Sequence, residues 1–279
     1  LFAHPFRNLR CNEDLHDHRA GCAMIAHMEI SKADLIEGMA RGMAVLESFD
    51  TERQRLNATL AAERAGIPRA AARRHLLTLA HLGYLETDGS HFWLSPKVLR
   101  FSGSFLASSR LPRAVQPTLN RLSAQTGESF SVAVLDGHEV VYVARSHSPR
   151  VVSIGFYAGA RVPAHVVGPG PAILSTLPEA RLAQWIAEHD FVTFNSNAPL
   201  TAKKFQKLVD KTRAQNFCIT TGHLDQGLTG VAVALRDRHG ECKAALSMTL
   251  QASLWTERAI EEKLVPLIVD TAQILRAVI

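Results

Sequence analysis

The sequence predicts an α+β protein in which an N-terminal winged helix-turn-helix precedes a larger C-terminal domain built on a mixed sheet. The first observation is that residues 56–65 and 69–79 read as two short helices joined by a tight turn, with a strand-type hairpin after them. The second is that residues 112–279 alternate β-branched runs with helical segments, which is typical of a sheet flanked by helices.

Composition bounds the class of protein. The chain has 279 residues, enough for one large domain or two ordinary ones, and 47% of them are hydrophobic, which supports folded cores. No apolar run of about 18 residues occurs, so we expect no membrane span. The four cysteines form no CxxC pair and no secretory signal is visible, so we expect a cytoplasmic location.

Residues 1–34 differ from the rest because they show no sustained apolar period. We expect a disordered tail or an upstream extension, with Met28 as a candidate natural start. Two cysteines and two histidines could be drawn as a zinc site, but their spacing matches no common finger. These are Cys11, His16, His18 and Cys22. A solvated tail is favoured, and we expect neither a metal nor a cofactor.

Residues 35–95 are predicted to form the winged helix-turn-helix. Its first helix spans 35–49, because apolar residues recur there at helical spacing. The stripe consists of Leu35, Met39, Met43 and Leu46. The residues expected to pack beneath the next two helices are Met43, Val45, Leu46 and Phe49.

The second and third helices meet at Gly66, a residue free to adopt positive φ. Pro68 is expected in the first turn of the third helix, where a missing N–H costs nothing. The apolar residues expected to face inward are Ala72, Leu76, Leu79 and Leu82. On another face, Arg69 and Arg73 stand one turn apart.

Positive charge is concentrated on this motif. Residues 53–74 carry six arginines and one acid, a net charge of +5 that equals the formal charge of the whole chain. Such a concentration is an electrostatic footprint for phosphate. The alternative is an ordinary amphipathic helix with solvated arginines, but the turn, the charge cluster and the hairpin would then coincide by chance.

The hairpin turns at Asp88-Gly89 between strands 84–87 and 92–94, and it is the predicted wing. We expect the third helix to enter the major groove and the wing tip to meet the DNA backbone. The residues predicted in the groove are Arg69, Ala70, Arg73 and Arg74. Those predicted on the backbone are Arg55, Ser90 and His91.

A linker helix is expected over 96–111, and the larger domain over 112–279. In that domain we expect two hairpins and several helices. The predicted strands are 129–135, 139–145, 151–156, 230–236 and 241–249. The predicted helices are 114–125, 172–189 with an interruption at Leu177-Pro178, 205–215 and 257–278.

Several short segments stand in an order that is specific although no single one is decisive. They are ARGMAVLESF at 40–49, LGYL at 82–85, VLDG at 134–137, RVPAH at 161–165, GLTGVAV at 227–233 and RDRHG at 236–240. With these segments the chain resembles the IclR family of bacterial transcriptional regulators from about Leu35 to its C-terminus. The start of the third helix is most similar to the subgroup that controls aromatic-acid breakdown through protocatechuate and β-ketoadipate.

The resemblance implies a winged helix, a linker helix and a C-terminal α/β domain of GAF-like architecture that binds a small effector. It implies a sequence-specific DNA-binding regulator controlled by a carboxylic acid, either aromatic or β-ketoadipate-like. It also implies homodimers, often paired into tetramers, on palindromic operator DNA, and no enzyme activity. Two-fold symmetry matched to the operator is expected of this motif.

The resemblance also implies an effector site. Its residues are Val162, Gly168, Pro169, Leu228, Gly230, Ser247 and Thr249. Amides near Gly168 precede a predicted helix and suit an anion, while Ser247 and Thr249 share one strand face. The alternatives are turn glycines and strand hydroxyls satisfied by backbone. The chain departs from the family at Pro169, which has no N–H, and at residues 220–223, which often include acids in the family.

Two other classes of function remain as alternatives. The first is an enzyme, but the sequence contains no nucleophile, zinc-protease or nucleotide-loop motif, and His165 is the best lone candidate for acid–base catalysis. A sensing or interaction module without DNA binding is the other alternative, which the arginine cluster argues against. Arg145 and Arg161 could bring positive charge near the effector, although surface positions are favoured for both.

Overall fold

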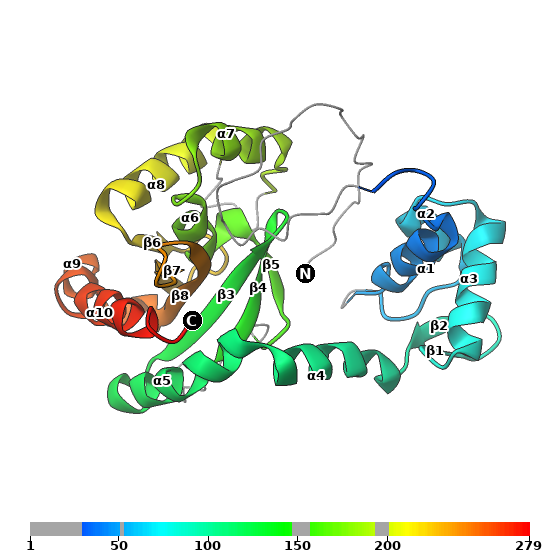
Figure 1. Ribbon diagram of the computed structural model, residues 1–279, viewed down its shortest axis with the longest axis horizontal. Helices are drawn as coiled ribbons and strands as arrows, with labels where there is room; N and C mark the ends of the chain where they lie inside the picture. The colour runs from blue at the N-terminus through cyan, green and yellow to red at the C-terminus, as the bar shows by residue number, and fades with distance from the viewer. Residues whose placement is uncertain (1–29, 51–52, 147–156, 193–200) are drawn as a thin grey trace. The chain divides into compact units, whose positions relative to one another are not determined.

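The computed structural model describes residues 30–50, 53–146, 157–192 and 201–279, drawn as ribbon in Figure 1. The chain divides into two compact units, and the division falls between Phe105 and Leu106. The zinc alternative within residues 1–29 and the strand predicted over 151–156 lie outside the described residues. None of the described helices is long and apolar enough to cross a membrane.

The first unit contains three helices and a two-stranded sheet. These are α1 (Glu37–Glu47), α2 (Ala58–Ala65), α3 (Arg69–His81), β1 (Leu85–Thr87) and β2 (Phe92–Leu94). The Asn57 side chain caps α2 by accepting from the amides of Thr59 and Leu60, and Gly66 ends the helix at φ 64°. Pro68 does not lie in the first turn of α3 as predicted, because its ψ of 142° places it just before the helix.

The core of this unit confirms the predicted packing of Val45 and Phe49 and corrects the rest of the packing predicted for α1. Its fully or nearly buried residues are Val45, Phe49, Leu56, Ala61, Ala62, Ala72, Leu76, Leu85 and Phe92. Leu35, Met39 and Met43 are exposed instead, because Val45 and Phe49 turn a different stripe of the helix toward the core. Leu82 is also exposed, since it caps the C-terminus of α3 after the last inward turn.

Two successive helices, interrupted at Ser109 where ψ is 128°, connect the two units. A short turn, Pro96–Val98, leads into α4 (Leu99–Ser108), and α5 (Arg110–Thr126) begins two residues later. Pro112 lies in the first turn of α5, where the backbone needs no N–H donor.

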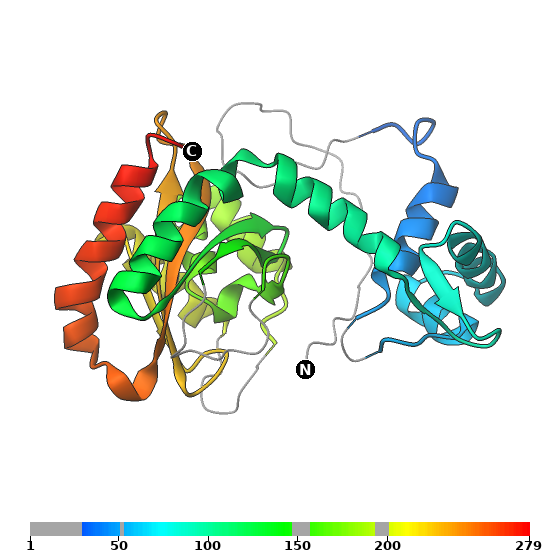
Figure 2. The same ribbon diagram turned by 90° about the horizontal axis from the view of Figure 1, so that it is seen from below.

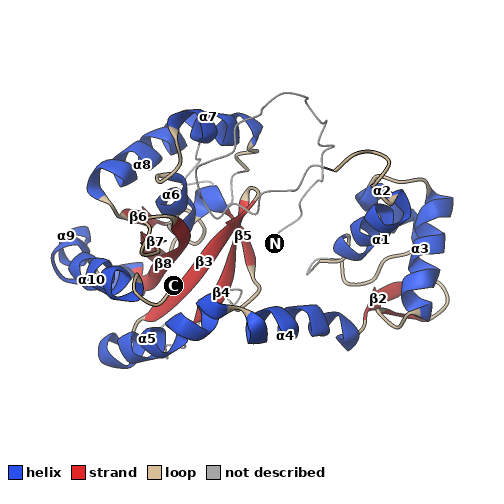
Figure 3. Cartoon of the chain, in the orientation of Figure 1, coloured by secondary structure: helices blue, strands red, loops and turns tan. Residues whose placement is uncertain are grey.

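The second unit is a six-stranded sheet in the order β5-β4-β3-β8-β7-β6 (Figure 3). Its strand pairs are all antiparallel, so the predicted mixed sheet is wrong. The strands are β3 (Ser129–Asp136), β4 (Glu139–Arg145), β5 (Arg161–Pro163), β6 (Cys218–Thr221), β7 (Leu228–Arg236) and β8 (Cys242–Gln251). Both predicted hairpins are present, β3–β4 and β7–β8. The edge strands β5 and β6 were not predicted, because three or four residues are too few to show alternation.

Helices cover both faces of this sheet, which gives three layers (Figures 1 and 2). One core cluster lies between the sheet and α5 with α10 (Val265–Leu275), and the other lies beneath α6 (Pro169–Leu174), α7 (Glu179–Glu188) and α8 (Ala202–Gln215). The predicted C-terminal helix forms as α9 (Glu257–Ala259), a π-helical turn (Ile260–Leu264) and α10. The predicted α+β class is confirmed.

Candidate functional site

The outer face of α3 is the first candidate site. Arg69, Ala70, Arg73 and Arg74 are all exposed there, while Ala72 and Leu76 of the same helix are completely buried. The arginine at the start of the helix is held in place, because its Nε donates to Thr59 Oγ1 of α2 at 3.0 Å. The helix therefore presents guanidinium groups beside a small residue, which permits close approach to a nucleic-acid groove.

Not every arginine of the predicted footprint faces outward. Arg64 donates from Nε to the Ser48 carbonyl oxygen at 2.7 Å and forms an ion pair with Asp50. Its side chain is about one-fifth exposed, so this charge ties α2 to the end of α1. The charge available to a phosphate backbone is consequently smaller than the sequence count indicates.

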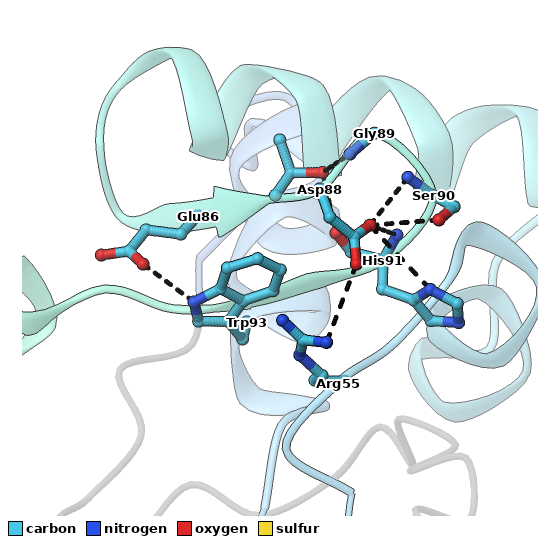
Figure 4. A network of polar contacts seen from close by, with 8 residues as sticks. Arg55, Glu86, Asp88, Gly89, Ser90, His91 and Trp93 are labelled. Atoms are coloured by element: carbon cyan, nitrogen blue, oxygen red, sulfur yellow. Dashed lines mark hydrogen bonds and ion pairs between the residues drawn. The ribbon is translucent and has the colours of Figure 1, made fainter.

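The wing turns around the carboxylate of Asp88, as Figure 4 shows. Its Oδ1 accepts from the amides of Ser90 and His91 at 3.0 and 2.8 Å and from the Ser90 hydroxyl at 3.1 Å. These hydrogen bonds, backbone ones first, lower the pKa of Asp88 to about 2. The wing tip therefore carries a negative charge at neutral pH, whereas the sequence indicated only a turn at Asp88.

Arg55 offsets that charge. Its Nη1 lies 3.7 Å from Asp88 Oδ2, and its guanidinium lies over the Trp93 ring, 4.2 Å from the centroid. Trp93 in turn donates from Nε1 to Glu86 at 2.9 Å (Figure 4). The predicted backbone contacts Arg55, Ser90 and His91 thus share one network, in which the hydroxyl of Ser90 already donates to Asp88.

A pocket in the second unit is the second candidate site. It spans about 400 Å³ of empty space, part of it open to solvent. Its lining consists of Tyr142, Val166, Val167, Gly168, Pro169, Thr220, His223, Leu224, Asp225, Leu228, Gly230, Ser247, Met248 and Thr249.

Six of the seven predicted effector residues line this pocket. They are Gly168, Pro169, Leu228, Gly230, Ser247 and Thr249. Val162 does not line it, because β5 is the edge strand on the far side of the sheet from β6 and β7, and Val162 is buried there opposite Val140. The lining residues that sequence reasoning did not place include Tyr142, Thr220 and His223.

Close packing explains two of the pocket glycines. A Cβ on Gly230 would lie 2.9 Å from Thr220 Oγ1, and one on Gly168 would lie 3.0 Å from the Cβ of Ala232. The predicted anion site at a helix start is weakened, since α6 has only six residues and the Gly170 amide donates to the Val167 carbonyl oxygen at 3.2 Å. These glycines serve the approach of α6 to β7.

The polar side chains of the described pocket lining are hydroxyls, the imidazole of His223 and the carboxylate of Asp225. Ser247 and Ser131 share a hydrogen bond between their hydroxyls at 2.9 Å. Burial lowers the pKa of His223 from its ordinary value of 6.5 and raises that of Tyr142, so both side chains are neutral near pH 7 when the pocket is empty. No lysine or arginine is found among the lining residues that the structure describes.

The remaining predicted candidates lie elsewhere in the second unit. Arg161 pairs with Asp136 and Glu139, both at 2.7 Å, and neither it nor Arg145 lines the pocket. His165 is buried, with Nε2 2.9 Å from the Val192 carbonyl oxygen and Nδ1 2.6 Å from His189 Nε2. Among the described residues, no cluster of histidine, cysteine and acid side chains has the arrangement of a metal site.

Comparison with known proteins assigns both units. The family described as IclR helix-turn-helix domain matches residues 38–89, and that described as bacterial transcriptional regulator IclR C-terminal matches residues 104–276. A p-hydroxybenzoate hydroxylase transcriptional activator of Acinetobacter baylyi is 41% identical, with 89% of this chain and 93% of the relative covered. A Pca operon regulatory protein of the same organism is 37% identical, covering 90% and 91%.

A solved structure extends the likeness to the second unit. It is the inducer-binding domain of a double mutant of the Acinetobacter transcription factor PobR in complex with 3-hydroxybenzoic acid. Its sequence is 31% identical and its TM-score is 0.57, with 61% of this chain and all of that domain covered. The predicted resemblance, including the subgroup of aromatic-acid regulators, is confirmed.

Proposed function

The chain belongs to the IclR family of bacterial transcriptional regulators, and from that membership we propose that it controls operator DNA in response to a hydroxybenzoate-like acid. The α3 residues Arg69, Ala70, Arg73 and Arg74 enter the major groove, and Arg55, Ser90 and His91 position the wing on the backbone. Such a regulator works on chromosomal DNA, so its place is the cytoplasm. It acts as a homodimer or tetramer without catalysis.

One observation carries the effector assignment. The pocket combines apolar walls with several hydroxyls, and it lies in the domain whose relative holds 3-hydroxybenzoic acid. An aromatic ring suits Val166, Leu228 and Met248, while Thr220, Ser247 and Thr249 supply oxygens for a phenol or carboxylate. The acid acts on DNA binding because it binds one arrangement of the protein better than another.

Thermal unfolding with a panel of acids tests the proposal. We expect 4-hydroxybenzoate, 3-hydroxybenzoate or protocatechuate to raise the melting temperature, because a ligand at 100 times its dissociation constant adds about 2.7 kcal/mol to native-state stability. β-Ketoadipate and cis,cis-muconate probe the pathway alternatives, and pyruvate is the small-acid control. Thr249→Phe, which fills the pocket from β8, is expected to abolish the shift. No shift with any acid would reject the assignment.

A further inference from the structure

Among the described residues that line the pocket, His223 is the one with a basic side chain. It lies in the connection between β6 and β7 and is half-buried. A hydroxybenzoate is an anion near neutral pH, and burying an unpaired carboxylate is costly. The pocket therefore needs a positive partner for its ligand, and the candidates are few.

None of the described groups that face the pocket from its other elements can supply this positive charge, so His223 is the candidate. Lining residues of α6, β7 and β8 contribute no ionisable side chain. Tyr142 of β4 contributes a phenol. Burial raises the pKa of this phenol, so the side chain stays neutral. Asp225 lies in the same connection as His223 and adds a carboxylate to the lining, with Oδ1 accepting from the Gly227 amide at 2.8 Å.

We propose that His223 takes up one proton from solvent when the acid binds and then pairs, as an imidazolium, with the ligand carboxylate. This inference rests on the proposed function and deepens it. The pocket would thereby select ionised acids over neutral molecules of the same shape.

Proton uptake is coupled to acid binding because the empty and the occupied pocket shift the pKa of His223 in opposite directions. In the empty pocket, burial lowers the pKa of His223 below 6.5, so the imidazole is neutral near pH 7. A bound carboxylate reverses the shift and raises the pKa in the complex. Between the two pKa values the complex holds one proton more than the free protein. Affinity is therefore constant below the free pKa and falls as pH rises toward the bound pKa, by at most about tenfold per unit.

Calorimetric titration of the full-length protein with 4-hydroxybenzoate tests this coupling. The titrations are run at about pH 7.5 in two buffers of different ionisation enthalpy, which separates proton uptake from binding heat. We expect uptake approaching one proton per ligand and a dissociation constant that rises several-fold from about pH 6 to about pH 8. His223→Asn, which keeps a hydrogen-bonding group but cannot be charged, is expected to bind more weakly with no uptake and no pH dependence.

Two controls separate the possible failures. Neutral 4-hydroxybenzamide should bind without proton uptake and more weakly than the acid, and Ser247→Ala should weaken the acid while keeping its proton uptake. Binding of the acid without proton uptake, or uptake that persists in His223→Asn, would overturn the role of His223 and leave the proposed function standing. Absence of binding by every aromatic acid would overturn both.

Discussion

Gly170→Ala is expected to lower the free energy of unfolding of the second unit by about 3 kcal/mol or more. The glycine is buried in the first turn of α6. A Cβ there would fall onto the carbonyl oxygen of Ala164 and lie 2.8 Å from its Cα. Both obstacles are backbone atoms, so no side chain can move aside, and the helix must retreat from the turn that it packs against.

Denaturant unfolding followed by circular dichroism measures this loss. Gly103→Ala is the matched control, because that glycine lies in α4 with no atom within 4 Å of the added Cβ. Alanine is the better helix former there by about 0.5–1 kcal/mol, so the control should be neutral or slightly stabilising. Equal stability of the Gly170 variant and the wild type would show that α6 does not approach Ala164 in this way.

Replacing Arg69, Arg73 and Arg74 together by alanine is expected to remove specific DNA binding. Each arginine in the groove or on a phosphate contributes about 1–3 kcal/mol, a factor of about 5–150 in affinity. The exposed guanidinium groups stand on one surface of α3, whereas Arg64 is engaged with Asp50 and is left unchanged. Folding should be unaffected, because the buried residues Ala72 and Leu76 are retained.

Fluorescence anisotropy with the duplex upstream of the gene gives the readout, repeated over a range of salt concentrations. Loss of phosphate contacts should also flatten the salt dependence by about one unit of slope per contact. The control removes equal charge from the second unit by changing Arg121, Arg181 and Arg258, all exposed, to alanine. Should both triple variants lose the same affinity, net charge and not the face of α3 would govern binding.

The DNA-binding unit could be predicted well because its signals are local. Gly66 ends α2 in the left-handed conformation, and Asp88-Gly89 forms the turn of the wing. The sequence predicted both turns at these positions. The packing of α1 could be predicted only in part. Val45 and Phe49 are buried as expected, whereas Met39 and Met43 have similar helical spacing but are exposed, because the tertiary fold decides which stripe is covered.

The effector pocket could be predicted only in part, because it is formed by pairing between strands that are distant in the sequence. Ser247 and Thr249 could be placed on one face by alternation, and Gly230 stands opposite Thr249 in the register of β7 and β8. Val162 was placed by resemblance alone, and its strand lies at the other edge of the sheet. The signal that could have found His223 was the unusual segment 220–223, which was interpreted only as a departure from the family.

Reciprocal coupling between the acid and the DNA tests the central claim most directly. The dissociation constant for the upstream duplex is measured with and without saturating 4-hydroxybenzoate, or the panel acid that gives the largest thermal shift, and that for the acid with and without duplex. Thermodynamic linkage requires that both change by the same factor, typically about 5–150. We predict such a shared factor. An acid that binds tightly yet leaves DNA affinity unchanged, with its own affinity unaffected by DNA, would contradict an effector-controlled regulator.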